Sequence, residues 1–263
     1  MTIELIEVRI AAMAAEAVGI VALELQPQAG ELPPFTAGAH IDLHLGNGLV
    51  RQYSLMNSQD ERHRYVIAVQ RDAAGRGGST YVHDALQPGA TLRISAPRNN
   101  FALDESAAHT VLIGGGIGIT PLISMAARLE ALRRSWTLHF CARTREHAAA
   151  QATLAAHGDK VRYNFDQEPG GRMLDIEALV AAAPPETHFY CCGPLPMLGA
   201  FERAMSARLP AFAHVEYFSA RAATAPVGAA GHSGGYTIEL AKSGQTLQVA
   251  AGSTILDTLI DAG

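Results

Sequence analysis

The sequence predicts two successive folded domains, an antiparallel β-barrel followed by a doubly wound parallel β-sheet. Residues 2 to about 100 hold many short stretches of alternating apolar and polar residues separated by turn signals, which is typical of a small barrel. After about Leu103, apolar strands alternate with helical segments, which indicates a parallel sheet with helices on both faces. At 263 residues, the chain is long enough to bury a core in each domain.

The barrel strands are expected where the alternation is clearest and turn residues bound it. Gly46-Asn47-Gly48 predicts a hairpin turn. Pro88-Gly89 ends the one helix expected in this region, over residues 78–86. The expected strands cover residues 3–10, 20–25, 40–45, 50–55, 65–70 and 91–95.

The rest of the chain predicts the second domain, a linker and a short C-terminal segment. The domain bounds are expected at residues 1–103 and 104–220, and residues 221–235, rich in Ala, Gly and Ser, predict a linker. Residues 236–263 predict one hairpin and the start of a helix, too little for an independent core. Within the second domain, strands are expected over 110–113, 136–141, 161–165, 188–192 and 215–218, and helices over 122–132, 146–156, 174–182 and 196–207.

Composition and charge exclude several classes of function. The chain has 25 acidic and 20 basic residues, and the basic residues are scattered, unlike the basic stripe of a nucleic-acid-binding protein. No signal peptide and no apolar run of membrane-spanning length is found, so we expect no membrane partner and a cytoplasmic location. The cysteines Cys141, Cys191 and Cys192 have no CxxC spacing and predict neither a disulfide framework nor a zinc site. The histidines show no metal-binding pattern either.

The most informative stretch is Gly114-Gly115-Gly116-Ile117-Gly118, which follows a short apolar run and precedes a helix. Glycines let the backbone turn sharply and approach a ligand, and the helix N-terminus suits a pyrophosphate. A plain packing turn would explain the glycines too, but the first strand–helix turn of a parallel sheet is a common dinucleotide site. Cys191-Cys192-Gly193-Pro194 closes another strand of this sheet and is expected on the same rim. Cys192 is the better candidate for contact with a ligand ring, whereas Cys191 is expected to fill the core.

Two motifs in the barrel suggest a second site. In Arg51-Gln52-Tyr53-Ser54-Leu55, Arg51 can hold a phosphate, Tyr53 can pack on a flat ring and Ser54 can form a hydrogen bond to it. Gly75-Arg76-Gly77-Gly78-Ser79 stands just before a helix and offers backbone N–H groups, a hydroxyl and a cation to an anion. An ordinary barrel strand and a flexible hairpin tip are the alternatives. Two sites of phosphate type, one in each domain, suggest two phosphorylated cofactors.

Taken together and in this order, the motifs RQYSL, GRGGS, GGGIGITP, CCGPLPM and HVEYF resemble those of the ferredoxin–NADP reductase superfamily. The C-terminal YTIEL and VAAGSTILDTLIDAG are similar to the start of a plant-type 2Fe–2S ferredoxin domain. The implied domain order, flavin, nicotinamide and then ferredoxin, is similar to that of the phthalate dioxygenase reductase and vanillate O-demethylase reductase families. The resemblance covers nearly the whole chain.

The resemblance implies a role for each motif residue. The flavin would contact the barrel strands and the GRGGS loop through Arg51, Gln52, Tyr53, Ser54, Ala68, Val69, Gln70, Gly75, Arg76, Gly77, Gly78 and Ser79. The nicotinamide nucleotide would face Gly115, Gly116, Gly118 and Thr120, with Cys192, Gly193 and Pro194 across from them. Ser54, Cys192, Glu216 and Phe218 would lie closest to the reacting rings.

The resemblance also implies the activity. It is hydride transfer from NADH or NADPH to FMN, followed by single-electron transfer to a 2Fe–2S centre and on to a Rieske-type oxygenase component or its ferredoxin. Hydride transfer needs the two rings at roughly 3–3.5 Å, which is mainly a positioning problem. Arg143 and Arg145 follow the second strand of the parallel sheet, where cations favour the 2′-phosphate of NADPH. A solvated loop is the alternative there, and the family habit favours NADH.

The identity of the cofactors leaves alternatives open. The glycine-rich loop is more similar to FMN-binding than to FAD-binding relatives, but a free-standing ferredoxin or flavin reductase using FAD or FMN is the second enzyme hypothesis. A non-catalytic binding module with degenerate sites is the third. A plant-type cluster needs cysteines in C-x4-C-x2-C spacing and a distant fourth, which these 263 residues do not contain. The 2Fe–2S centre is therefore expected only in a longer chain.

Overall fold

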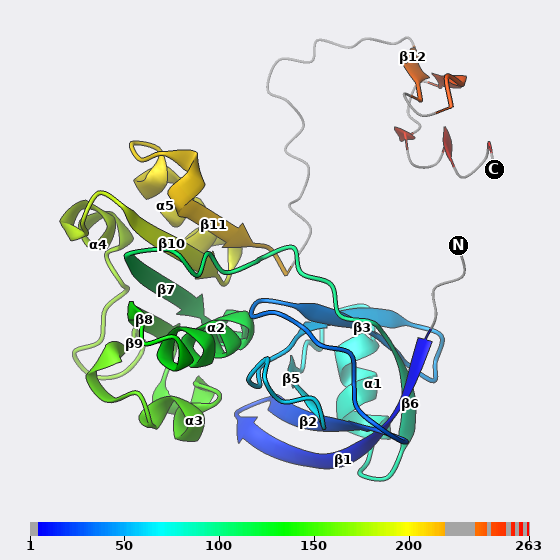
Figure 1. Ribbon diagram of the computed structural model, residues 1–263, viewed down its shortest axis with the longest axis horizontal. Helices are drawn as coiled ribbons and strands as arrows, with labels where there is room; N and C mark the ends of the chain where they lie inside the picture. Colours follow the sequence, from blue (N-terminus) through cyan, green and yellow to red (C-terminus); the bar gives the residue numbers. More distant parts are fainter. Residues whose placement is uncertain are drawn as a thin grey trace. The chain divides into compact units, whose positions relative to one another are not determined.

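A computed structural model describes residues 5–218, 235–240, 243–250, 254–255, 258–259 and 262 (Figure 1). The chain divides into two compact units, Met1–Ala220 and Arg221–Gly263. The predicted linker lies outside the described residues except for Gly235. No helix in the described ranges is long and apolar enough to cross a membrane.

The first part of the chain forms a six-stranded antiparallel sheet around an apolar core that includes Leu23, Ile41 and Tyr65. The order of the strands is β4-β3-β6-β1-β2-β5, and the helix α1 (Gly78–Ala85) lies between β5 and β6 in sequence. This confirms the predicted antiparallel barrel. The strands are β1 (Leu5–Ala17), β2 (Ile20–Pro27), β3 (His40–His44), β4 (Val50–Ser54), β5 (Tyr65–Gln70) and β6 (Thr91–Ser95).

The strand β1 is longer than the alternation predicted. Its second half continues along β2, with Ala14 opposite Ala22 and Ala15 opposite Val21. Two register irregularities interrupt the pairing, after Ile10 and after Ala15. Because the added residues are mostly alanines, the sequence has no clear apolar alternation there, and the pairing with β2 extends the strand instead.

The second part of the chain is a five-stranded parallel sheet of order β11-β10-β7-β8-β9, as predicted. The helix α2 (Thr120–Ala131) packs in one apolar cluster, and α4 (Ile176–Ala182) and α5 (Leu195–Met205) pack in another with the alternate residues of the same strands. Helices therefore cover both faces, and the sheet is doubly wound (Figure 1). The strands are β7 (His109–Gly115), β8 (Ser135–Ala142), β9 (Val161–Phe165), β10 (Thr187–Cys192) and β11 (Ala213–Glu216).

The helix expected over residues 146–156 was predicted wrongly. The chain instead forms a short 3-10 turn, η2 (Arg145–His147), and a five-residue helix, α3 (Gln151–Ala155). Between them Ala150 has φ 57°, and its N–H donates to the Glu16 carboxylate of β1 at 3.1 Å. The run of alanines has a high helix propensity, but its burial and this contact with the barrel override that propensity.

The two domains of the first unit share one buried apolar cluster. Ala68 of β5 and Ile119, at the end of the glycine turn, both belong to it. The Gly38 N–H of the barrel donates to Ser124 Oγ of α2 at 3.2 Å. The barrel and the parallel sheet are therefore packed together, which fixes the barrel strands relative to the glycine turn.

The second unit contains the predicted hairpin. Its strands β12 (Tyr236–Glu239) and β13 (Thr246–Val249) pair antiparallel, with Tyr236 opposite Val249. Ile255, Thr258 and Leu259 are helical, in the region where a helix was expected, and the residues around them lie outside the described ranges.

Candidate active site

The carboxyl ends of β7 and β10 meet at the centre of the parallel sheet. Their register places Cys192 opposite Gly114. The chain adds β8 and β9 on one side of β7 and then β10 and β11 on the other, so the order of the sheet reverses between β7 and β10. Open α/β sheets bind ligands at such a reversal. The structure thus places the glycine turn and Cys192-Gly193-Pro194 on one rim.

Close backbone contact explains two of the glycines on this rim. A Cβ on Gly118 would lie 2.3 Å from the carbonyl oxygen of Cys192, and one on Gly115 would lie 2.7 Å from Cδ of Pro194. A larger residue at either position would push the two motifs apart. Gly116 differs, since it has φ 54° and no atom of the described residues lies within 4 Å of an added Cβ. Its backbone therefore borders open space.

The glycine turn leads through a 3-10 turn directly into the helix α2. Residues Gly116–Ile119 form a 3-10 turn, η1, and no side chain caps the N-terminus of α2. Thr120 is buried, and its hydroxyl donates to Ile117 O at 3.0 Å. The hydroxyl thus braces the turn. The Thr120 N–H donates to Ile117 O and Pro121 has no N–H, so it is the positive end of the helix dipole, rather than free N–H groups of α2, that suits an anion.

Glu216 and Cys192 lie opposite each other at the ends of β11 and β10. Burial raises the pKa of the Glu216 carboxyl to about 7, and its Oε2 atom has no hydrogen-bond partner among the described residues. Cys192 is fully buried, and burial followed by the nearby Glu216 raises the pKa of its thiol. The thiol is therefore protonated near neutral pH, and the carboxyl oxygen is an unpaired buried group that a ligand could satisfy.

The Arg51 side chain joins β4 to the glycine-rich loop before α1. Its Nη2 donates to Arg76 O at 3.0 Å and its Nη1 to Val50 O at 2.8 Å. A Cβ on Gly78 would lie 2.6 Å from Arg51 Nε, so only glycine lets the guanidinium lie here. Gly77 has φ 77° and precedes α1 without a side-chain cap. A cation thus stands beside the open N-terminus of a helix, which is the arrangement of a phosphate site.

The loop that carries these glycines is braced by Asp72. The Asp72 N–H donates to Ser79 Oγ at 3.0 Å, and Asp72 Oδ1 accepts the N–H of Ala74 at 3.0 Å. A Cβ on Gly75 would lie 2.8 Å from Asp72 Oδ2. Gly75 and Ser79 therefore shape the loop, and Ser79 acts on the Asp72 backbone rather than as a helix cap.

The ring-binding candidates of the barrel lie on β4 and β5. Tyr53 is half-buried, and burial raises the pKa of its hydroxyl to about 12, so the ring stays neutral. Ser54 is buried and stands opposite His40 in the β3–β4 ladder. Ala68 of β5 lies in the cluster that also contains Ile119 of the glycine turn. The barrel strands and the nucleotide-type turn are thus adjacent.

The other predicted residues are less enclosed or point elsewhere. Gln52 and Gln70 are exposed, and the Val69 side chain belongs to the barrel core, so only its backbone could meet a ligand. Arg143 is exposed, whereas Arg145 lies over the Phe165 ring at 5.0 Å and donates its N–H to the Glu168 carboxylate at 2.6 Å.

Phe218 lies two residues after Glu216, the last residue of β11, and it is 46% exposed. No cluster of metal-ligating side chains occurs in the described part of the chain.

Two groups of residues near the site were missed from the sequence. Tyr190, His188 and His214 form a stack that leads along β10 and β11 toward Cys192 and Glu216. The spacing of His188, Tyr190 and Cys192 by two residues was the signal, because alternate residues of a strand share a face.

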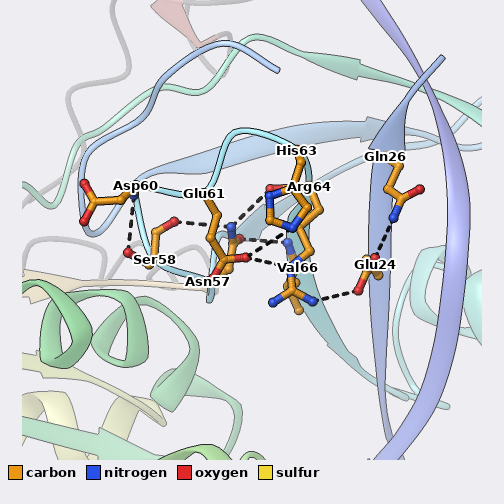
Figure 2. A network of polar contacts seen from close by, with 9 residues as sticks. All are labelled: Glu24, Gln26, Asn57, Ser58, Asp60, Glu61, His63, Arg64 and Val66. Carbon is orange, nitrogen blue, oxygen red and sulfur yellow. Dashed lines mark hydrogen bonds and ion pairs between the residues drawn. The ribbon is translucent and has the colours of Figure 1, made fainter. Parts of the chain in front are cut away.

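The second missed group surrounds Asn57, just beyond β4, and links this segment to β5 (Figure 2). A lone Asn in a loop gives no such signal.

The chain is similar to several reductases along nearly its whole length. It is 51% identical to phenoxybenzoate dioxygenase subunit beta of Ectopseudomonas oleovorans over 98% of this chain and 79% of that protein. It is 41% identical to vanillate O-demethylase oxidoreductase of Pseudomonas sp. (strain HR199 / DSM 7063) over 98% of this chain and 82% of that protein. No family model matches.

Among solved structures, the fold is similar to that of phthalate dioxygenase reductase. The TM-score is 0.77 and the identity 35%, over 98% of this chain and 80% of that one. That protein is described as a modular structure for electron transfer from pyridine nucleotides to a 2Fe–2S centre.

Proposed function

The chain belongs to the phthalate dioxygenase reductase and vanillate O-demethylase reductase family, whose members are oxidoreductases, and from this we propose that it is the reductase component of a Rieske-type oxygenase system. In this role it transfers a hydride from NADH or NADPH to FMN, and single electrons then pass to a 2Fe–2S centre. One observation carries the proposal: Ala68 of the flavin-type barrel and Ile119 of the nucleotide-type turn share one buried cluster.

The barrel residues fit FMN. Arg51 packs on Gly78 beside the uncapped N-terminus of α1, and this pair suits the terminal phosphate of FMN. Tyr53 supplies a neutral ring for stacking, and Ser54, the last residue of β4, supplies a hydroxyl beside it. FMN would thus lie along β4, with its phosphate near Arg51 and its ring near Tyr53 and Ser54. A mononucleotide needs no further anion site in the barrel.

The rim of the parallel sheet fits the nicotinamide nucleotide. The backbone of Gly116 borders open space, and the positive end of the α2 dipole suits the pyrophosphate. Glu216 Oε2 is a buried acceptor without a partner among the described residues, and a carboxamide is a donor that would satisfy it. Phe218, two residues after Glu216 and half-exposed, would cover the ring surface that the nicotinamide must reach.

The protein's contribution to catalysis is positioning. Bound FMN supplies the chemistry that turns a two-electron donor into a source of single electrons. The close backbone contact between the glycines of η1 and Cys192 fixes the two motifs of the rim relative to each other. The shared apolar cluster fixes the rim relative to β5. Cys192 is buried and its raised thiol pKa keeps it neutral, so it packs beside a ring without reacting.

The proposed partner is an oxygenase component or its ferredoxin. The 2Fe–2S centre would be carried by a longer form of the chain or by that ferredoxin. Cys141, Cys191 and Cys192 are free thiols, which fits the reducing cytoplasm that we propose as the compartment.

The test is an anaerobic titration of the purified protein, reconstituted with FMN, while the visible spectrum is recorded. We expect NADH to bleach the flavin absorption at stoichiometric amounts, and the same titration with NADPH ranks the two donors. Retention of FAD in preference to FMN, or a flavin spectrum that neither nucleotide changes, would contradict the proposal.

Arg51→Ala gives the matched test of the phosphate site. It is expected to weaken FMN binding by at least about tenfold, because a charge-assisted contact is worth roughly 1.5–3 kcal/mol. Arg9→Ala is the control, since Arg9 is an exposed arginine on β1 whose Nη2 donates to Gln26 at 3.3 Å. Equal binding by both variants would exclude Arg51 from the flavin site.

A further inference from the structure

The two edge strands of the barrel are not paired along their lengths. β4 forms a ladder with β3, and β5 forms one with β2, so β4 and β5 are the two ends of the sheet. Among the described residues, no ladder joins Val50–Ser54 to Tyr65–Gln70. Both strands carry residues of the proposed flavin site. The separation of these two edges therefore sets the space available to a flat ring.

The edges are joined just beyond Ser54. The Met56 N–H donates to Val66 O at 2.8 Å, and the Val66 N–H donates to Asn57 Oδ1 at 2.9 Å. Both backbone groups of Val66 are thus satisfied from the β4 side, one by backbone and one by a side chain. We call this pair of hydrogen bonds the Val66 bridge. Asn57 replaces the backbone carbonyl that a regular ladder would have supplied.

Asn57 is held in one orientation. It is only 8% exposed, and its Nδ2 donates to Arg64 O at 3.1 Å and to Ser58 O at 3.3 Å. All the polar atoms of its side chain are therefore bonded to backbone. The direction of the amide is fixed by these contacts, since the oxygen faces an N–H and the nitrogen faces two carbonyls.

The β5 side of the bridge is held independently. Arg64 Nη1 lies 2.8 Å from Glu24 Oε2 of β2, and Arg64 Nε lies 2.6 Å from Glu61 Oε2 (Figure 2). Gln26 Nε2 in turn donates to Glu24 Oε1 at 2.8 Å. The start of β5 is thereby fixed to β2, and Asn57 is the side chain that ties β4 to it.

We propose that Asn57 is a positioning residue for the flavin, because the Val66 bridge sets the distance between Ser54 and Ala68. Ser54 lies two residues before Met56, and Ala68 lies two residues after Val66, so antiparallel register places them opposite each other at the start of the unpaired gap. This inference rests on the proposed function, since it assigns the gap to the flavin ring.

The test compares Asn57→Ala with Ser58→Ala. Ser58 belongs to the same loop, but among the described residues its Oγ accepts only the Asp60 N–H at 3.3 Å and forms no hydrogen bond with β5. Two quantities are measured well below the melting temperature: the exchange rate of the Val66 amide in the apoprotein, and the dissociation constant of FMN. We expect Asn57→Ala to speed the exchange and to raise the dissociation constant about tenfold, and Ser58→Ala to change neither.

The outcomes distinguish the positioning role of Asn57 from the proposed function of the protein. Faster exchange of the Val66 amide with unchanged FMN affinity would overturn the positioning role, because the bridge would then be only structural. A wild-type protein that does not bind FMN would overturn the proposed function itself, while the exchange rates would still report on the bridge. If Asn57→Ala fails to fold, Asn57→Ser replaces it with the same expectation, since a serine hydroxyl is too short to reach Val66.

Discussion

The ring of Tyr190 stacks on the imidazole of His214, with centroids 4.1 Å apart and planes inclined by 7°. The stack continues to His188, whose Nδ1 lies 3.2 Å from His214 Nε2. The Tyr190 hydroxyl accepts the N–H of Asp104 at 2.7 Å and donates to Ala102 O at 3.3 Å. The segment between the two domains is thus bound to the strands that end in the candidate site.

Tyr190→Phe is expected to destabilise the protein by about 1–3 kcal/mol, because the Asp104 N–H and the Ala102 carbonyl lose their partner while the ring stack remains. Denaturant unfolding measures this. Tyr163→Phe is the control, since its hydroxyl makes no hydrogen bond to described residues and its removal should cost little. Equal effects of the two substitutions would show that the Tyr190 hydroxyl does not bind the interdomain segment.

His139 makes stability depend on pH below neutrality. Burial, with a smaller contribution from Arg162, lowers the pKa of His139 to about 4. The unfolded chain therefore binds a proton that the folded chain does not, between about pH 6.5 and pH 4. His139 therefore leaves the free energy of unfolding at its full value above pH 6.5. As the pH falls through this window, that free energy decreases by roughly 3 kcal/mol in total, at ~1.4 kcal/mol for each pKa unit.

His139→Leu should flatten this part of the stability profile. The free energy of unfolding is measured by urea denaturation at several pH values from 4 to 7. A profile with the same slope in the variant and the wild type would assign the pH dependence to other groups.

Glu216 acts in the opposite direction. Burial raises the pKa of the Glu216 carboxyl to about 7, so the folded chain holds a proton that the unfolded chain has already released. The free energy of unfolding is therefore highest below the ordinary carboxyl pKa, and it decreases as the pH rises through 7. Glu216→Gln removes the buried charge and is expected to stabilise the protein by about 2 kcal/mol at pH 8, and by much less at pH 4. Thermal unfolding of apoprotein at both pH values tests this. A gain that is equal at the two pH values would contradict the assigned pKa.

The alternation of strands and helices was enough to predict the parallel sheet and its rim. Crossover connections have one handedness, and the ends of parallel strands meet on one edge, so Gly118 and Cys192 could be placed together from their positions in the pattern. Their contact, with 2.3 Å from an added Cβ to a carbonyl oxygen, needed the structure.

The features that the sequence did not predict depend on contacts distant in the chain. Ala148–Ala150 is buried and bonded to Glu16, and no local propensity encodes that contact. Asn57 resembles any polar loop residue until the strand register sets its oxygen against Val66 N–H. The arginines at 143 and 145 were predicted as nucleotide contacts from position alone, and this stays a prediction.

Gly118→Ala is expected to impair use of the nucleotide. The added methyl group must displace the Cys192 backbone, which should cost about 1–3 kcal/mol of stability as overpacking. Since a shift of about 1 Å can lower a rate on the order of 100-fold, we expect kcat/KM for NADH to fall by roughly 10- to 100-fold. Steady-state kinetics with a dye acceptor measures it. Gly199→Ala in α5 is the control, because its nearest neighbour would lie at 3.6 Å and a helical alanine should stabilise by about 0.5–1 kcal/mol.

Phe218→Ala tests the residue that we place over the ring. At 46% exposed, Phe218 buries too little surface for its loss to cost more than about 1 kcal/mol of stability. The substitution should instead change KM for both NADH and NADPH, because in the proposed site the nicotinamide, which the two donors have in common, shares the position of the phenyl ring or displaces it. Leu209→Ala, at an exposed apolar residue before η4 (Pro210–Phe212), is the control for the loss of surface alone. Unchanged kinetics with both nucleotides in Phe218→Ala would place the nicotinamide away from the end of β11, and Glu216 would then need another partner for its buried oxygen.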